Sequence, residues 1–134
     1  MSQIGAYTNN RLKRKEMNVK ELRVGNLVLS GKKPKTFKIE NGYNIEAAEF
    51  YLPIPMTEKH LLMFKFEYYG YLFDCKLYKK GIISVSVLKG IFTLSLKRDA
   101  KSNYIPLREF EHVHQLQNLY FALTQKELEL KPQP

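Results

Sequence analysis

The clearest hydrophobic pattern in the chain is a helical one near its C-terminal end. Apolar residues recur there at spacings of three, four and three, which places them on one face of a helix over residues 111–124. Leu119 widens this face. The four residues that define it are Val113, Leu116, Tyr120 and Leu123. We therefore expect a long helix that covers the apolar side of a sheet.

The middle of the chain reads as strands. Residues 83–87 and 92–96 form the best-defined hairpin, with apolar residues on one face, serine and threonine on the exposed face, and a turn at Lys89-Gly90. Before it, residues 66–78 predict two strands, or one long strand bent at Gly70. A turn is expected between these regions, at Lys79-Lys80-Gly81.

The N-terminal half also alternates, over shorter stretches. Strands are expected at residues 27–30 and 36–39, followed by a hairpin turn at Asn41-Gly42, because both residues tolerate positive φ. Residues 43–50 should return as a strand or an irregular edge. Residues 51–55 should leave the sheet, because each of their two prolines lacks a backbone donor.

Two further helix signals flank the strand-rich middle. Thr57 is a good N-cap for a short helix that contains His60, which we interpret as an ordinary helix residue. Thr124 and Glu127 have capping-box spacing, so a second short helix could begin there. Residues 128–130 alternate instead, and an edge strand is the competing prediction.

These patterns predict an α+β fold. We expect an antiparallel, partly barrel-like sheet of about five to seven strands, with the short middle helix and the long C-terminal helix packed on it. A chain of 134 residues is long enough for one domain with a real core. We place this single domain at residues 17–130, after a flexible basic arm at 1–16 and before a frayed tail at 131–134.

Charge changes the picture, because it is unevenly placed. The chain carries 22 basic and 13 acidic residues, a formal net charge of +9. Residues 11–38 hold ten of the basic and two of the acidic residues, so this segment is +8 and the remainder is +1. Such a block suggests a polyanion or an acidic protein surface as partner. The alternative is that lysines maintain solubility and protect an edge strand. The ten basic residues are Arg11, Lys13, Arg14, Lys15, Lys20, Arg23, Lys32, Lys33, Lys35 and Lys38.

The inventory of reactive side chains predicts no enzyme. Cys75 is the only cysteine and lies in an aromatic, strand-like run, where it is expected to be a small buried hydrophobe. His112 and His114 would point about 200° apart on a helix, so we expect no metal site, although on a strand they could bind together. Phosphate-binding loops, cofactor motifs, membrane spans and a secretory signal are not expected either.

Two kinds of binding are compatible with the pattern. Tyr68, Tyr69 and Tyr71 could offer stacking surfaces to a nucleic acid whose phosphates meet the basic residues. Alternatively, at least one of these tyrosines packs under the long helix. A protein partner could instead pair with an edge strand, or the basic arm could order on an acidic groove.

Three blocks of sequence carry a resemblance. KELRVGN at 20–26, PIPMTE with a following Leu61-Leu62, and VHQLQNLYFALT at 113–124 resemble a largely uncharacterised family of small proteins from phages and mobile elements. The blocks span residues 17–130, and the arm lies outside them. The resemblance implies a genetic context and no catalytic residues. Gln125 stands where a glycine is common.

The resemblance and the charge together suggest a function. We expect a non-enzymatic accessory protein, without cofactor or metal, that acts in the cytoplasm of a bacterial host by binding a host protein or ribonucleoprotein. An RNA-guided CRISPR defence nuclease with its guide RNA is one such partner, which would make the protein an anti-CRISPR inhibitor. The alternatives are a direct RNA- or DNA-binding module and a virion or assembly component.

Overall fold

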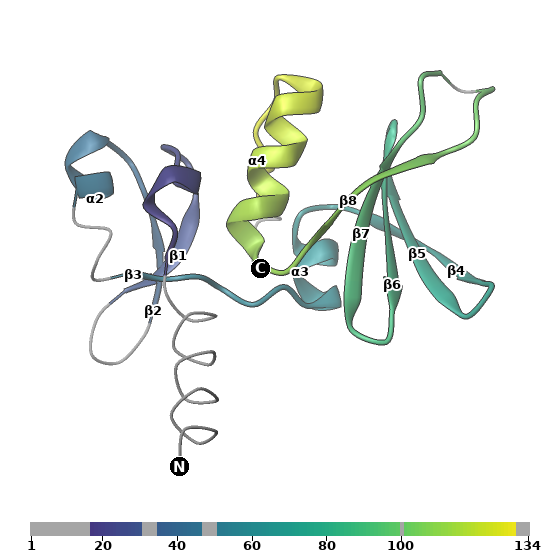
Figure 1. Cartoon of the computed structure of the whole chain (residues 1–134), viewed down its shortest axis with the longest axis horizontal. Coiled ribbons are helices and arrows are strands. Elements are labelled where there is room, and N and C mark those ends of the chain that lie inside the picture. Colours follow the sequence, from purple (N-terminus) through teal and green to yellow (C-terminus); the bar gives the residue numbers. More distant parts are fainter. Residues whose placement is uncertain (1–16, 31–34, 47–50, 100, 131–134) are drawn as a thin grey trace, which may run out of the picture. The chain divides into compact units, whose positions relative to one another are not determined.

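The computed structural model describes residues 17–30, 35–46, 51–99 and 101–130. It divides the chain into two compact units, Met1–Ile54 and Pro55–Pro134 (Figure 1). The α+β class is confirmed, with antiparallel sheets, a short middle helix and a C-terminal helix. The predicted arm at 1–16 and tail at 131–134 lie outside the described residues.

In the first unit, the described residues form a small sheet in the order β2-β1-β3. Its core joins Val28, Ile39 and Tyr51, and the ring of Tyr51 stacks on Phe37 at a centroid distance of 5.5 Å. The elements of this unit are η1 (Val19–Glu21), β1 (Leu27–Ser30), β2 (Lys35–Lys38), α2 (Gly42–Glu46) and β3 (Tyr51–Leu52).

The predicted hairpin turn at Asn41-Gly42 is wrong, because Asn41 caps a helix instead. Its side-chain oxygen accepts a hydrogen bond from the backbone of Asn44, and Asn44 in turn accepts from the backbones of Glu40 and Asn41. This reciprocal capping starts α2 where a returning strand was expected. Residues 47–50 lie outside the described part. The prediction that residues 51–55 leave the sheet is wrong for Tyr51 and Leu52, which form β3 and pair with β1.

In the second unit, five described strands follow one another in the antiparallel order β4-β5-β6-β7-β8 (Figure 1). The strands predicted for 83–96 are confirmed, and Ile83, Val85 and Leu94 are fully buried as expected. The exposed face predicted for their serines is wrong, because Ser84 and Ser95 are buried as well. The elements are α3 (Glu58–Met63), β4 (Glu67–Leu72), β5 (Cys75–Lys80), β6 (Ile83–Leu88), β7 (Ile91–Leu96), β8 (Ile105–Phe110) and α4 (Val113–Thr124).

The barrel-like part of the prediction is wrong. Among the described strands, β4 and β8 are the two edges of the sheet and do not pair with each other. Each edge is interrupted: β4 by an irregularity between Tyr68 and Gly70, and β8 by Pro106, which has no backbone N–H. The sheet therefore stays open.

The helix α3 is fixed at both ends by its own sequence. Thr57 caps it as predicted, in a capping box whose second member is His60. At the other end, the backbone of Phe66 donates to Leu61 and that of Lys65 donates to Leu62, while Lys65 adopts φ 71°. These two bonds form a Schellman motif, which normally favours glycine at the position that Lys65 occupies.

A partly buried polar contact ties α3 to the sheet. The hydroxyl of Tyr78 on β5 donates to Glu58 Oε1 at 2.6 Å, and Lys76 Nζ lies 3.3 Å from the other carboxylate oxygen. Burial, and then the bond to Glu58, raise the pKa of Tyr78 above its usual value.

The C-terminal helix α4 begins two residues later than predicted, with His112 as its N-cap. Its apolar face is buried at Val113, Leu116 and Tyr120, and the Tyr120 ring meets Phe66 edge-on, just before β4. None of the helices in the described residues is long and apolar enough to cross a membrane.

Both predictions for residues 124–130 are wrong. Gln125 takes φ 60°, and the Thr124 hydroxyl donates to Tyr120 O and accepts from the backbone of Lys126. Thr124 therefore closes α4 instead of capping a new helix, and the chain beyond it runs as neither helix nor strand through Leu130.

The left-handed conformation of Gln125 predicts that Gln125→Gly stabilises the protein. A Cβ in this region costs about 1 kcal/mol, which glycine avoids. Gln125→Ala is the matched control, since it loses the same side chain but keeps the Cβ. In urea unfolding, the glycine variant should exceed the alanine variant by about 1 kcal/mol in free energy of unfolding. Equal stability of the two variants would contradict the assignment of this helix end.

Candidate functional site

The predicted basic residues are only partly within the described chain. Arg11, Lys13, Arg14, Lys15, Lys32 and Lys33 lie outside it. Lys20, Lys35 and Lys38 are exposed in the first unit, and Arg23 donates to Val24 O at 3.2 Å. Lys35 and Lys38 stand at the two ends of β2, an edge strand of its sheet in the described residues. This placement is compatible both with partner binding and with edge protection.

The three predicted tyrosines are exposed on β4. Tyr68, Tyr69 and Tyr71 keep 50%, 59% and 67% of their surface, so the alternative that one of them packs under the long helix is wrong. The aromatic partner of α4 is Phe66 instead.

The three tyrosines also do not share one face. Tyr68 contacts the ring of Tyr78, whereas Tyr69 contacts Lys79, the next residue of β5. Because the successive β5 residues Tyr78 and Lys79 face opposite sides of the sheet, Tyr68 and Tyr69 lie on different faces.

A pocket of about 350 Å³ lies at the end of the sheet where β5 and β7 finish and where β4 and β8 begin. Among the described residues, four lysines, one glutamate and two tyrosines line it, so the charged side chains sum to +3. We call it the lysine–tyrosine pocket; these residues are Lys65, Lys79, Lys80, Lys97, Glu67, Tyr69 and Tyr104.

Aromatic rings hold two of the lysines in place. Lys79 Nζ lies 4.4 Å from the ring centre of Tyr69 and 5.3 Å from that of Tyr104. Lys97 Nζ lies 5.0 Å from the centre of the same Tyr104 ring. Attraction between an ammonium group and a ring face offsets part of the repulsion between like charges. The Tyr104 hydroxyl donates to Gly81 O at 3.1 Å, which fixes the ring.

Two serines lie on the same face of the sheet as Lys79. Ser84 and Ser95 stand directly opposite each other and in register with Lys79, so all three share one face of the sheet. The alternation predicted this serine face to be exposed, yet Ser84 is 1% exposed and Ser95 is 7% exposed. We infer that the longer side chains of the pocket cover the two serines.

The remaining two lysines are constrained by the backbone and by burial. Lys65 occupies the left-handed position that ends α3. Burial lowers the pKa of Lys80, the charge of Lys65 lowers it further, and Glu129 opposes both effects. Positive charge is thus gathered at a site where it is not fully compensated.

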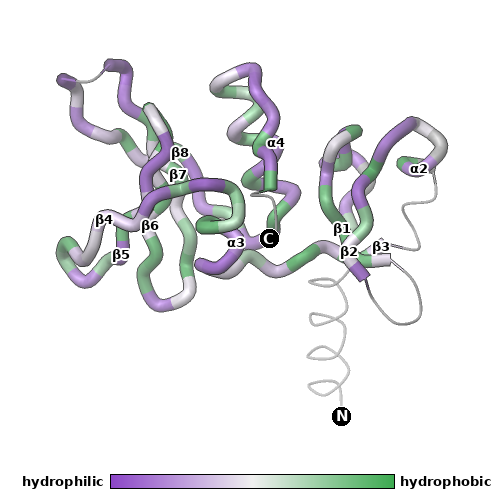
Figure 2. Tube along the Cα trace, turned by 180° about the vertical axis from the view of Figure 1, so that it is seen from behind, coloured by the Kyte–Doolittle hydropathy of each residue, from purple (hydrophilic) through white to green (hydrophobic). Residues whose placement is uncertain are grey.

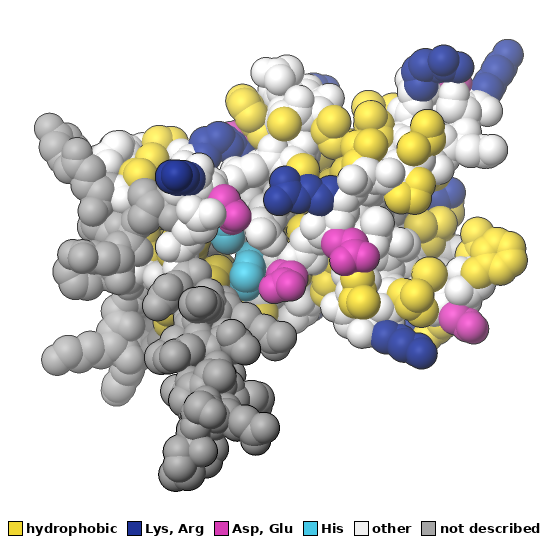
Figure 3. Space-filling model, viewed as in Figure 1, with side chains coloured by type: hydrophobic (Ala, Val, Ile, Leu, Met, Phe, Trp, Pro, Cys, Tyr) yellow, Lys and Arg dark blue, Asp and Glu magenta, His cyan; other side chains and the backbone are white. Residues whose placement is uncertain are grey.

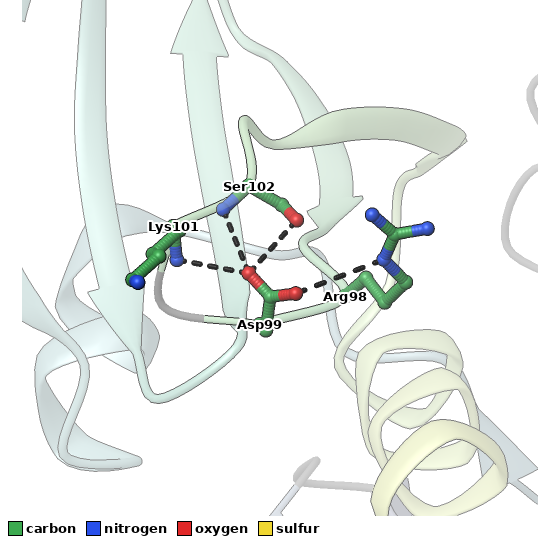
Figure 4. A network of polar contacts seen from close by, with 4 residues as sticks. All are labelled: Arg98, Asp99, Lys101 and Ser102. Carbon is green, nitrogen blue, oxygen red and sulfur yellow. Dashed lines mark hydrogen bonds and ion pairs between the residues drawn. The ribbon is translucent and has the colours of Figure 1, made fainter.

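The connection between β7 and β8 carries Lys97 and Tyr104 into the pocket, and Asp99 organises it (Figure 4). One oxygen of Asp99 accepts from the Ser102 hydroxyl and from the backbones of Lys101 and Ser102, at 2.9–3.0 Å. Arg98 Nε lies 3.7 Å from the other oxygen. The Ser102 hydroxyl first, and then the Lys101 backbone, lower the pKa of Asp99. Figure 2 shows this connection as mostly hydrophilic.

The other candidate chemistries find less support. The prediction that His112 and His114 point apart is wrong, because their rings stack with a centroid distance of 5.8 Å. The helical spacing does not apply to His112, which is the N-cap of α4 and has an extended backbone. Within the described residues, no three or more His, Cys, Asp or Glu side chains gather as a metal site would require. Cys75 is a partly buried free thiol at the start of β5.

Comparisons with protein-family models, with curated proteins and with solved structures found no match. The lysine–tyrosine pocket therefore rests on its own geometry. Sequence reasoning found Tyr69 but missed the lysines around it, because it assigned Lys79 and Lys80 to a turn. In the structure β5 continues to Lys80, and both residues belong to the sheet.

The Asp99 contacts predict a titration. When Asp99 is protonated, its hydrogen bonds to the Lys101 and Ser102 backbones weaken, so these two amide signals should shift together in an NMR pH titration. The common midpoint should lie below the ordinary aspartate pKa of about 3.9, because the lowered pKa favours the charged form. In Asp99→Asn, this transition should be absent. A midpoint at or above the ordinary value would show that the contacts do not form in solution.

Proposed function

We propose that this chain is a non-enzymatic protein that binds single-stranded nucleic acid through the lysine–tyrosine pocket. The observation that carries the proposal is the convergence of four lysines and two tyrosines at one end of a sheet. Lysines supply point charges for phosphates, and the exposed ring of Tyr69 supplies a stacking surface that every base can use. The basic segment at 11–38 adds sequence-independent attraction.

A single strand suits this site better than a duplex. Tyr69 is exposed at an edge strand, where its ring can meet an unpaired base, whereas bases inside a duplex present no free ring face. Binding of this kind depends on both charge and stacking, so it should weaken with salt but not vanish when salt is moderate.

Removing two of the pocket lysines should weaken binding. We expect Lys79→Gln/Lys97→Gln to lose about tenfold in affinity for a short single-stranded oligonucleotide, and the slope of log affinity against log salt to fall by about 1.4. Fluorescence anisotropy over a salt series measures both quantities.

The matched control is Lys59→Gln/Lys89→Gln, which removes the same net charge from exposed positions outside the pocket. Its affinity should fall much less. An equal loss in both double variants would mean that only net charge matters, and that the pocket is not the site. The absence of any binding at low salt would refute the proposed function.

A second candidate function is binding to a host nucleoprotein, for which the resemblance suggests an RNA-guided defence nuclease. One observation favours a protein contact: Phe73, in the turn between β4 and β5, is 89% exposed. Phe73 and Asp74 both have positive φ, at 52° and 66°, where asparagine and glycine are preferred. A strained, solvent-exposed aromatic residue is suited to insert into an apolar pocket of a partner.

The turn supplies its own test of this second candidate. Phe73→Asn removes the aromatic ring and suits the positive φ, so the fold should be at least as stable. Asp74→Gly relieves the same turn but keeps the ring. In pull-downs from a nuclease-treated host lysate, the Asp74→Gly variant should recover the same RNA-guided nuclease as the unaltered protein, and Phe73→Asn should not. Equal recovery by both variants, or recovery of no such nuclease, would remove this candidate.

A further inference from the structure

The lysine–tyrosine pocket holds more positive charge than an internal phosphate of a nucleic acid can balance. Four lysines line a pocket of about 350 Å³, with Glu67 as the acidic residue among the described lining. A phosphodiester carries one negative charge, whereas a terminal phosphomonoester carries between about 1.5 and 2 at neutral pH. A chain end therefore matches the charge of this pocket better than the middle of a strand.

The neighbouring surface points the same way. A second pocket of about 510 Å³ shares Lys65 and Lys80 with the first but is also lined by Glu127 and Glu129. Its described charged residues, three lysines and two glutamates, sum to only +1. Two carboxylates would repel a phosphate chain that continued through the first pocket into the second. The charge pattern thus favours a strand that stops in the lysine–tyrosine pocket.

The backbone conformation of Lys65 adds a third observation. A left-handed lysine is disfavoured relative to glycine at the same helix end. This position nonetheless carries a long cationic side chain, and that side chain lines both pockets. Residues in strained conformations cluster at functional sites, and Lys65 lines both pockets.

We propose that the lysine–tyrosine pocket binds the terminal phosphomonoester of a nucleic-acid strand. The inference rests on the proposed function and names the group that the same site selects. The lysines that line the pocket supply the positive charge for the phosphate, and the part of the Tyr69 ring that Lys79 leaves exposed is available to the terminal base.

The test compares short single strands of one sequence that end in a 5′-phosphate, a 3′-phosphate or hydroxyl groups only. A hydroxyl-ended strand two nucleotides longer controls for total charge. We expect one phosphate-ended strand to bind about tenfold more tightly than both hydroxyl-ended strands. Inorganic phosphate and a nucleoside monophosphate serve as competitors. Stronger competition by the monophosphate would show that the base contributes, whereas equal competition would confine the contact to the phosphate.

Lys65→Gly is the decisive variant, because it removes the charge while relieving the backbone. It should abolish the preference for the phosphate-ended strand and leave the protein at least as stable in urea unfolding. Lys59→Gln, outside the pocket, should keep the preference.

The two proposals fail in different ways. If hydroxyl- and phosphate-ended strands of equal charge bind equally, the end-specific site is wrong while the proposed function stands. The same holds if Lys65→Gly keeps the preference. If no strand binds at low salt, the proposed function fails. The phosphate site then stands only if the nucleoside monophosphate or inorganic phosphate binds to the unaltered protein and does not bind to the Lys65→Gly variant.

Discussion

The side chain of Tyr104 connects most of what distinguishes this sheet. Tyr104 directly precedes β8. Its hydroxyl donates to Gly81 O between β5 and β6, and its ring contacts Lys79 and Lys97. This path crosses the sheet from its β8 edge to the connection between β5 and β6. One aromatic ring therefore contacts two of the pocket lysines, and its hydrogen bond to Gly81 fixes where they are held.

Backbone strain is spread unevenly along the described chain. Lys65 and Gln125 take positive φ at helix ends, and Phe73 and Lys89 do so in two-residue turns. Glycine or asparagine would serve all four positions at lower cost. Lys65 and Phe73 differ from the other two in their surroundings: Lys65 lines the lysine–tyrosine pocket, and Phe73 exposes an aromatic ring. Strained residues cluster at functional sites, so the surroundings of these two side chains support a function more than the backbone strain does by itself.

The sequence predicted those elements whose signals are local. The strands around Lys89-Gly90 and the cap at Thr57 follow from alternation and capping chemistry, and both are confirmed. Asn41 failed as a predictor because the same residue suits a turn and an N-cap, and only Asn44, three positions later, decides between them. The pocket could not be predicted from alternation, since its parts come from four separate strand ends. The serine face was taken for a solvated surface because periodicity shows which residues share a face but not what covers it.

The meander order of the second unit gives the two ends of its sheet different chemistry. Because each strand reverses direction, the start of β4, the end of β5 and the β7–β8 connection meet at one end, and these segments supply the pocket lysines. The turns after β4 and β6 meet at the other end, where Leu72, Phe73, Leu88 and Ile91 are exposed beside Asp74 and Lys89. Figure 3 shows basic side chains over the β7–β8 connection at the upper right and hydrophobic ones around the β4–β5 turn at the right edge. A naked nucleic acid can use only the basic end, because apolar side chains gain nothing from phosphates. A nucleoprotein presents both phosphates and apolar protein surface, so its chemistry matches both ends of the sheet, and the exposed ring of Phe73 is the apolar anchor on which that second candidate function depends.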